Sequence, residues 1–144
     1  MEKRIVQFLK KHHVCTLATC QDGQPWCASV FYVFIEEEDV LIFTSDPTTR
    51  HISEVLLNQK VAGAIAVETE VIGWIRGVQF SGIVTEPSDP EVKKKVRKIY
   101  LTRFPYAILN SSPLWILELH EVVFTDNRLG FGKKLRWSRS CKLL

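Results

Sequence analysis

Cysteine pairs with the spacing of a zinc site or a redox motif are missing from this sequence. Its four cysteines, at positions 15, 20, 27 and 141, form no Cys-x-x-Cys motif and have no cluster of histidines beside them. This spacing argues against a zinc site and against thioredoxin-type chemistry. We expect buried free thiols in a reducing compartment.

Long apolar runs are also missing. No stretch approaches the roughly 20 apolar residues that a membrane-spanning helix needs. The opening segment MEKRIVQFLKKHH is amphipathic and has no signal-peptide core. The sequence therefore predicts a soluble, cytoplasmic protein.

The common catalytic motifs are absent too. There is no Gly-x-Ser-x-Gly nucleophile elbow, and GFG at 130–132 followed by two lysines lacks the spacing of a phosphate-binding loop. The four histidines do not form a metal-ligating set, and His13 and His120 are more typical of structural positions. No catalytic residue and no metal ligand is predicted.

Positive charge is concentrated in two places. Residues 127–144 contain six cations and no acid, whereas acids outnumber cations in the rest of the chain. A second group of cations lies in 90–104, where apolar residues recur at helical spacing, so a helix with a solvated cationic face is expected. These two segments keep open the alternative of a nucleic-acid-binding module.

The pattern of apolar residues predicts a mainly β protein with flanking helices (α+β). The length of 144 residues and the 46% hydrophobic content fit one domain over 1–144, with a basic tail from about 127. Six short strands with few helices favour a small barrel, because closure of a sheet removes its exposed edges. We expect helices at 2–11, 47–58 and 90–104, and strands at 14–20, 26–35, 40–45, 60–69, 74–86 and 113–125.

The stretch TSDPTTRH, residues 44–51, is the strongest candidate for a binding site. Asp46 and Pro47 are typical of a helix start, and the free N–H groups of a helix N-terminus attract anions. Thr48, Thr49 and Arg50 would add hydroxyl and guanidinium donors for a phosphate. The alternative is a capped turn in which Arg50 pairs with Glu54, and these residues alone leave the two interpretations open.

Several segments, taken in order, resemble one protein superfamily. WCASVFYVF, TRH, IRGVQFSG, RKIY with RFP, and FTDNRLGFGKK with a following tryptophan are similar to the YhbP-like branch of the pyridoxamine phosphate oxidase-like split barrels, which bind FMN. The resemblance covers nearly the whole chain. It implies a six-stranded split β-barrel of the FMN-binding type that acts as a homodimer, with the cofactor site at the dimer interface.

The resemblance also implies which residues would contact FMN. The phosphate would be held at the third strand and the following helix, the flavin ring would lie along the second strand, and a further strand would approach from the side. The partner chain would add residues near the C-terminus. The implied residues are, in that order, Thr44, Thr48, Thr49, Arg50 and His51; Ala28, Ser29, Val30 and Phe31; Arg76, Gly77 and Gln79; and Lys133, Lys134 and Trp137.

The sequence departs from the oxidase at three positions. Ala28 and Val33 stand where the oxidase has an arginine and a lysine that help to neutralise the phosphate, and Gly77 replaces a glutamine. Pyridoxamine phosphate is therefore not an implied substrate. The leading hypothesis is an FMN-dependent oxidoreductase of unknown substrate, and the alternative is a non-catalytic protein that binds flavin or haem on a degenerate barrel.

Overall fold

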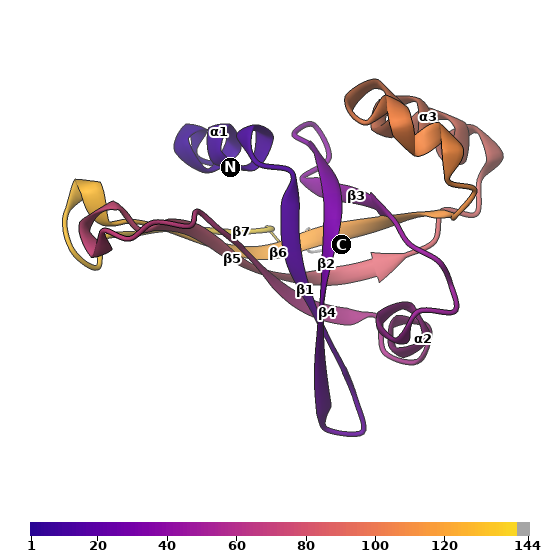
Figure 1. Cartoon of the computed structure of the whole chain (residues 1–144), viewed down its shortest axis with the longest axis horizontal. Coiled ribbons are helices and arrows are strands. Elements are labelled where there is room, and N and C mark those ends of the chain that lie inside the picture. Colours follow the sequence, from indigo (N-terminus) through magenta and orange to yellow (C-terminus); the bar gives the residue numbers. More distant parts are fainter. Residues whose placement is uncertain (141–144) are drawn as a thin grey trace.

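The computed structural model describes residues 1–140, which form an antiparallel sheet that closes into a ring (Figure 1). The strands are β1 (Val14–Gln21), β2 (Gln24–Ile35), β3 (Val40–Thr44), β4 (Lys60–Ala66), β5 (Arg76–Thr85), β6 (Leu114–Asp126) and β7 (Lys134–Ser138). Their order in the sheet is β3-β2-β1-β4-β5-β6-β7, and an additional pairing of β3 with β6 closes the first six strands. This arrangement confirms the mainly β fold with flanking helices.

Three α-helices and three short 3-10 helices connect or flank the strands. They are α1 (Lys3–Lys11), α2 (Arg50–Leu57), α3 (Pro90–Arg103), η1 (Ile72–Trp74), η2 (Pro105–Leu109) and η3 (Asn127–Leu129). None of the helices formed by residues 1–140 combines the length and the apolar composition that crossing a bilayer would require.

The hydrophobic core has two parts, which explains why some strands are apolar on both faces. The interior of the ring contains inward residues of every barrel strand, and α1 adds Ile5 and Leu9 to it. On the outside of β2 and β3, Val33 and Ile42 pack against Val96 and Tyr100, which both belong to α3. The runs YVFI and VLIF are therefore covered on both faces.

Glycines at two places shape the sheet. Asp22 and Gly23 have positive φ angles of 50° and 74°, as a two-residue hairpin turn requires, and they join β1 to β2. Gly82 marks a close approach of β6, because a Cβ at this position would lie 2.1 Å from the Glu118 carbonyl oxygen. The register between β5 and β6 shifts between Ser81 and Gly82, which leaves His120 of β6 as the extra residue of a β-bulge.

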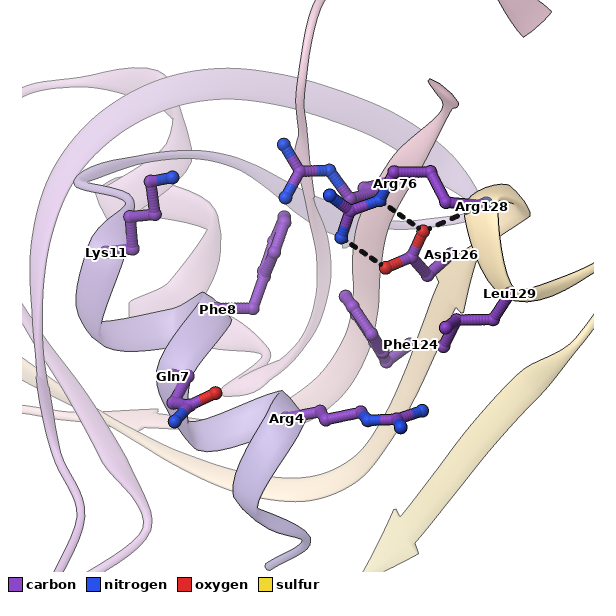
Figure 2. A pocket seen from close by; sticks show the side chains of 9 residues that line it. All are labelled: Arg4, Gln7, Phe8, Lys11, Arg76, Phe124, Asp126, Arg128 and Leu129. Carbon is purple, nitrogen blue, oxygen red and sulfur yellow. Dashed lines mark hydrogen bonds and ion pairs between the residues drawn. The ribbon is translucent and has the colours of Figure 1, made fainter. Parts of the chain in front are cut away.

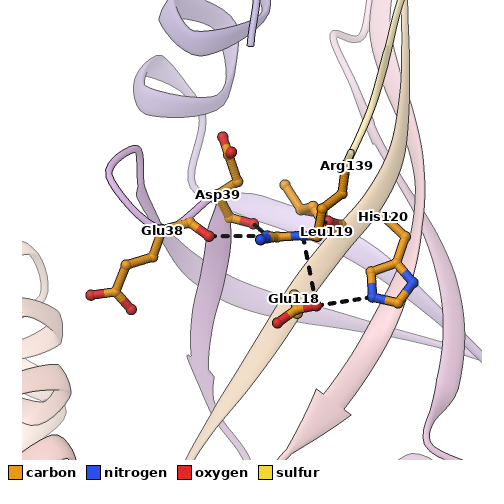
Figure 3. Close-up of polar contacts among 6 residues, drawn as sticks. All are labelled: Glu38, Asp39, Glu118, Leu119, His120 and Arg139. Atoms are coloured by element: carbon orange, nitrogen blue, oxygen red, sulfur yellow. Dashed lines mark hydrogen bonds and ion pairs between the residues drawn. The ribbon is translucent and has the colours of Figure 1, made fainter. Parts of the chain in front are cut away.

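The segment after β6 differs from the expected basic tail. Residues 127–129 form η3, and residues 134–138 form a seventh strand that was not predicted from the sequence. Arg139 then donates hydrogen bonds to the carbonyl oxygens of Leu119, Glu38 and Asp39 at 2.8–3.0 Å (Figure 3). This clasp joins the chain after β7 to the β2–β3 turn and to β6.

Three predicted boundaries of helices and strands were wrong, and so was the predicted burial of Cys27. The helix expected from residue 47 begins at Arg50, the strand expected to reach 69 ends at Ala66, and the strand expected from 74 begins at Arg76 because η1 precedes it. Cys15 is buried, but Cys27 is exposed on β2, and Cys141 lies outside the described residues.

Candidate functional site

A compact polar turn follows β3. The Asp46 carboxylate accepts from the backbone N–H and the hydroxyl of Thr48, both at 2.7 Å, and these bonds lower the pKa of Asp46. The Thr49 hydroxyl donates to the Asp46 carbonyl oxygen, also at 2.7 Å. Asp46 therefore closes a local turn and does not cap α2, whose N-cap is Thr49.

The helix α2 leaves its first N–H groups without a partner. The first backbone bond of the helix runs from the Ser53 N–H to the Thr49 carbonyl oxygen. Within residues 1–140, the N–H groups of Arg50, His51 and Ile52 have no protein acceptor. Donors of this kind favour an anion at the start of a helix.

Arg50 lies at this helix start and is fixed from two sides. Its Nε donates to Glu54 Oε1 at 2.9 Å, and its guanidinium carbon lies 4.1 Å from the centre of the Trp26 ring on β2. About half of the Arg50 side chain stays exposed (51%), so its remaining N–H groups can reach a ligand. The hypothesis of an Arg50–Glu54 pair and the hypothesis of an anion site are thus compatible.

Glu54 is the buried carboxylate behind Arg50. It is 5% exposed, and the hydroxyl of buried Thr19 on β1 donates to its second oxygen at 2.5 Å. The hydrogen bond from Thr19 and the one from Arg50 lower the pKa of Glu54, so the carboxylate stays ionised at neutral pH. Thr19 and Trp26 are register partners on β1 and β2, and neither was predicted from the sequence to belong to the site.

His51 forms a second polar group with Ser45 and Thr49. Its Nε2 lies 2.7 Å from the Ser45 hydroxyl and 3.4 Å from the Thr49 hydroxyl. Burial lowers the pKa of His51, so the ring is neutral at physiological pH. The Thr44 hydroxyl donates to the carbonyl oxygens of Ser112 and Pro113, which leaves it no free proton for a phosphate.

The first half of β2 has an open edge next to Trp26. Residues 24–31 pair with β1, whereas β3 pairs only with residues 32–35, so within residues 1–140 no strand covers the other edge of 24–31. Ser29 and Phe31 are exposed on the outer face, Ala28 is half-buried, and Val30 points into the core and can offer only backbone atoms. A planar ring could meet both backbone groups and side chains along this edge.

The remaining candidate residues lie elsewhere in the same chain. Gly77 sits against β4, where a Cβ would be 2.9 Å from the Ile65 carbonyl oxygen, and Gln79 is exposed on the outer face. Lys133 and Lys134 are exposed near the start of β7, whereas half-buried Trp137 packs against the core of its own barrel. In Figure 1 the start of β7 lies at the opposite end of the molecule from α2.

Arg76 is also separated from Arg50, Glu54 and Trp26, which we call the Arg50 group. It lines a pocket under α1 together with Phe8 and Asp126 (Figure 2). The structure therefore brings Arg50 of α2 against Trp26 of β2, next to the open edge of 24–31, and it does not bring Arg76, Lys133, Lys134 or Trp137 to them within one chain.

Comparison with known proteins places the chain among split-barrel proteins. A family model described as pyridoxamine 5'-phosphate oxidase matches residues 1–124. A UPF0306 protein of Yersinia pseudotuberculosis is 42% identical over 135 residues, which cover 94% of this chain and 91% of that protein.

Solved structures with low sequence identity share the fold. A haem-binding protein from Mycobacterium smegmatis has a TM-score of 0.72 at 19% identity; the match covers 88% of this chain and 52% of that one, so the chain spans about half of that protein. An FAD-binding protein from Mesorhizobium loti has a TM-score of 0.68 at 17% identity, covering 85% and 92%. The fold is thus found in proteins that bind flavin and in proteins that bind haem.

Proposed function

The chain belongs to the pyridoxamine 5'-phosphate oxidase family and, within it, to the UPF0306 proteins, and from this premise we propose that it is an FMN-binding oxidoreductase acting as a homodimer. The observation that carries this proposal is the position of Arg50. Its guanidinium lies at the start of α2, against Trp26 and beside the open edge of β2. One site would therefore offer donors for a phosphate next to a surface for a planar ring.

The donors at the start of α2 fit the phosphate of FMN. Three backbone N–H groups and the free N–H groups of Arg50 would face it, and a helix N-terminus adds a partial positive charge. The hydroxyls of Thr44 and Thr48 already donate within the protein, so they would contribute less than the sequence analysis expected.

The open edge of β2 fits the flavin ring. The exposed ring of Trp26, on the side of β2 that faces Arg50, offers apolar contact, and the backbone groups at the open edge offer partners for the polar edge of the ring. When bound, FMN would supply the electron-transfer chemistry. The protein's residues would hold and orient the cofactor, and Glu54 would keep Arg50 in place.

Exposed apolar residues support the homodimer. Ile72 and Trp74 of η1 and Phe131 after η3 are between 63% and 78% exposed. The Asn127 side chain donates to the Ile72 carbonyl oxygen, which joins the two segments at one end of the molecule. Contact with a second copy would remove this apolar surface from water, and the partner's Lys133 and Lys134 could then reach the cofactor.

The proposal is tested by identifying the ligand of the purified protein. We expect FMN by mass spectrometry of the released ligand, a flavin absorbance spectrum, and a rise in melting temperature with added FMN that exceeds the rise with riboflavin, which lacks the phosphate. Size-exclusion chromatography with light scattering measures the dimer. Protein that purifies colourless and shows no thermal shift with excess FMN contradicts the proposal.

A non-catalytic haem-binding role is the second candidate. The His13 ring stacks on Phe31 with centroids 5.8 Å apart, so an imidazole stands on the outer face of β2, beside the strand with the open edge. A Soret band after incubation with haemin, lost in His13→Ala but kept in His120→Ala, supports this role. Bound flavin that a reduced nicotinamide cofactor can reduce favours the oxidoreductase.

A nucleic-acid-binding role has less support. Lys95 of the basic helix α3 pairs with Glu38, and Arg103 donates to the carbonyl oxygens of Lys10 and His12. Arg139 belongs to the clasp after β7. Part of the positive charge thus has an intramolecular role, and binding to heparin that disappears at moderate salt would reflect charge alone.

A further inference from the structure

A cavity of about 350 Å³ lies between α1 and the ends of β5 and β6 (Figure 2). In Figure 1, α1 and α2 lie on opposite sides of the barrel, so this cavity is separate from the Arg50 group. The volume is near the lower end of the range for small-molecule sites. The cavity is lined by Arg4, Gln7, Phe8, Lys11, Arg76, Phe124, Asp126, Arg128 and Leu129.

The lining has a strong excess of positive charge. It includes four cations and a single acid, and that acid is already paired. Asp126 is 4% exposed and accepts from Arg128 Nε at 2.9 Å and from Arg128 Nη2 at 2.7 Å, which lowers the pKa of Asp126. Within residues 1–140, Arg4, Lys11 and Arg76 form no ion pair, so three cations face the cavity without an anion.

In the part of the chain that the structure describes, the Arg76 side chain lacks a hydrogen-bond acceptor that a bound anion could supply. Its Nε is buried and has no hydrogen-bond partner among the described residues, and the same is true of Nε2 of nearby His12. A buried donor without an acceptor is costly, and native proteins rarely retain one without a reason. Burial lowers the pKa of His12, and the charges of Lys11 and Arg76 lower it further, as expected in a positive field.

Apart from Gln7, the rest of the lining is apolar and mostly aromatic. Phe8 of α1 and Phe124 of β6 are at most 5% exposed, and their ring centroids lie 5.2 Å apart. Leu129 extends the same wall. A bare inorganic ion would use the cations but leave this wall in contact with water, whereas a ligand with an apolar body would cover it.

We propose that this cavity is a second binding site, which holds a small organic anion with its carboxylate or phosphate among Arg4, Lys11 and Arg76 and its apolar or aromatic body against Phe8 and Phe124. The site does not depend on the proposed flavin site. Three separate parts of the chain build it, namely α1, the β5–β6 pair and η3, so a bound anion would tie α1 to the barrel.

The test uses the full-length protein and four probes in calorimetric titrations, with and without saturating FMN. Phenyl phosphate and benzoate combine a ring with an anion, inorganic phosphate has only the charge, and benzyl alcohol has only the ring. We expect at least one aromatic anion to bind about tenfold or more tightly than inorganic phosphate and than benzyl alcohol. The affinity should be the same with FMN present.

Two double variants of α1 locate the binding. Arg4→Ala with Lys11→Ala removes two cavity cations and should weaken aromatic-anion binding about tenfold or more. Lys3→Ala with Lys10→Ala is the matched control, because it removes the same charge from positions of the same helix that do not line the cavity, and it should change the affinity less than about twofold. NMR of the arginine Nε–H groups gives a second measurement, in which the Arg76 signal should move on titration.

Each other outcome contradicts the proposal. Equal affinity for inorganic phosphate and for both aromatic anions would mean that the apolar wall takes no part. An equal loss in the two double variants would mean a nonspecific effect of charge. Competition with FMN would place the probe in the flavin site, and an unchanged Arg76 signal under saturating probe would place it elsewhere on the surface.

Discussion

The guanidinium carbon of Arg50 lies 4.1 Å from the centre of the Trp26 ring, so a helix residue and a strand residue form one continuous surface. Glu54 fixes the other side of Arg50 through a 2.9 Å hydrogen bond to Nε. The arginine is therefore oriented before any ligand arrives, which lowers the entropy that binding must overcome.

Removing the Arg50 side chain should weaken FMN binding. Arg50→Ala deletes a cation and its charge-assisted hydrogen bonds to the phosphate, and we expect a loss of about tenfold or more in affinity, measured by quenching of flavin fluorescence. Riboflavin binding should change little. Lys94→Ala, which removes an exposed cation from α3, is the control, and an unchanged affinity in Arg50→Ala would remove the phosphate site from the proposal.

The contact of Arg50 with Trp26 should appear as an energetic coupling. We expect Trp26→Ala to reduce FMN affinity several-fold, because it removes both a ring surface and the contact that orients Arg50. In a double-mutant cycle with Arg50→Ala, the two losses should be less than additive by about 0.5–1 kcal/mol. Strictly additive losses would show that the two residues act independently.

Glu54 should make stability depend on pH in the acidic range. Its pKa is lower in the folded protein than the ordinary value of 4.5, so its contribution is fully present above that value and is lost as the pH falls through the folded-state pKa. We expect Glu54→Gln to lower the melting temperature by a few degrees at pH 7. The difference from the wild type should shrink towards pH 3, and a constant difference would contradict the role assigned to the carboxylate.

Local signals in the sequence predicted the parts of the fold that depend on neighbouring residues. The alternation of apolar residues predicted the barrel strands, and the adjacent pair Asp22-Gly23, which is typical of a two-residue hairpin turn, joins the first two of them. The start of α2 was misplaced because Asp46 bonds Thr48 in a turn before the helix begins. The seventh strand was missed because its five residues follow a glycine-rich turn and carry two cations.

The candidate site was only partly predictable for a related reason. Arg50 and its pairing with Glu54 could be proposed from helical spacing, but Trp26 reaches Arg50 through the register of β1 and β2 and the packing of α2 on them. The cavity under α1 depends on residues as far apart as Arg4, Arg76 and Arg128. No local pattern relates such positions, so only the folded chain reveals the cluster.

The clasp formed by Arg139 should contribute to stability. Its guanidinium donates to three backbone carbonyl oxygens, and Arg139→Ala would leave these acceptors without their donor (Figure 3). We expect the free energy of unfolding to fall by about 1–3 kcal/mol in urea denaturation. Arg136→Ala, which removes an exposed arginine from β7, should change it by less than about 0.5 kcal/mol, and equal losses would contradict a specific role of the clasp.

The close approach of β5 and β6 at Gly82 gives the sharpest stability test. A Cβ at this position would lie 2.1 Å from the Glu118 carbonyl oxygen and 2.9 Å from Leu117 Cδ2, so Gly82→Ala must push β5 away from β6. We expect a loss of about 3 kcal/mol, at the upper end of the range for overpacking, or failure to fold. Gly73→Ala in η1 is the matched control, because a Cβ there meets nothing within 4 Å, and it should leave the melting temperature nearly unchanged. A stable Gly82→Ala protein with native hydrogen-exchange protection in β5 and β6 would contradict the close approach.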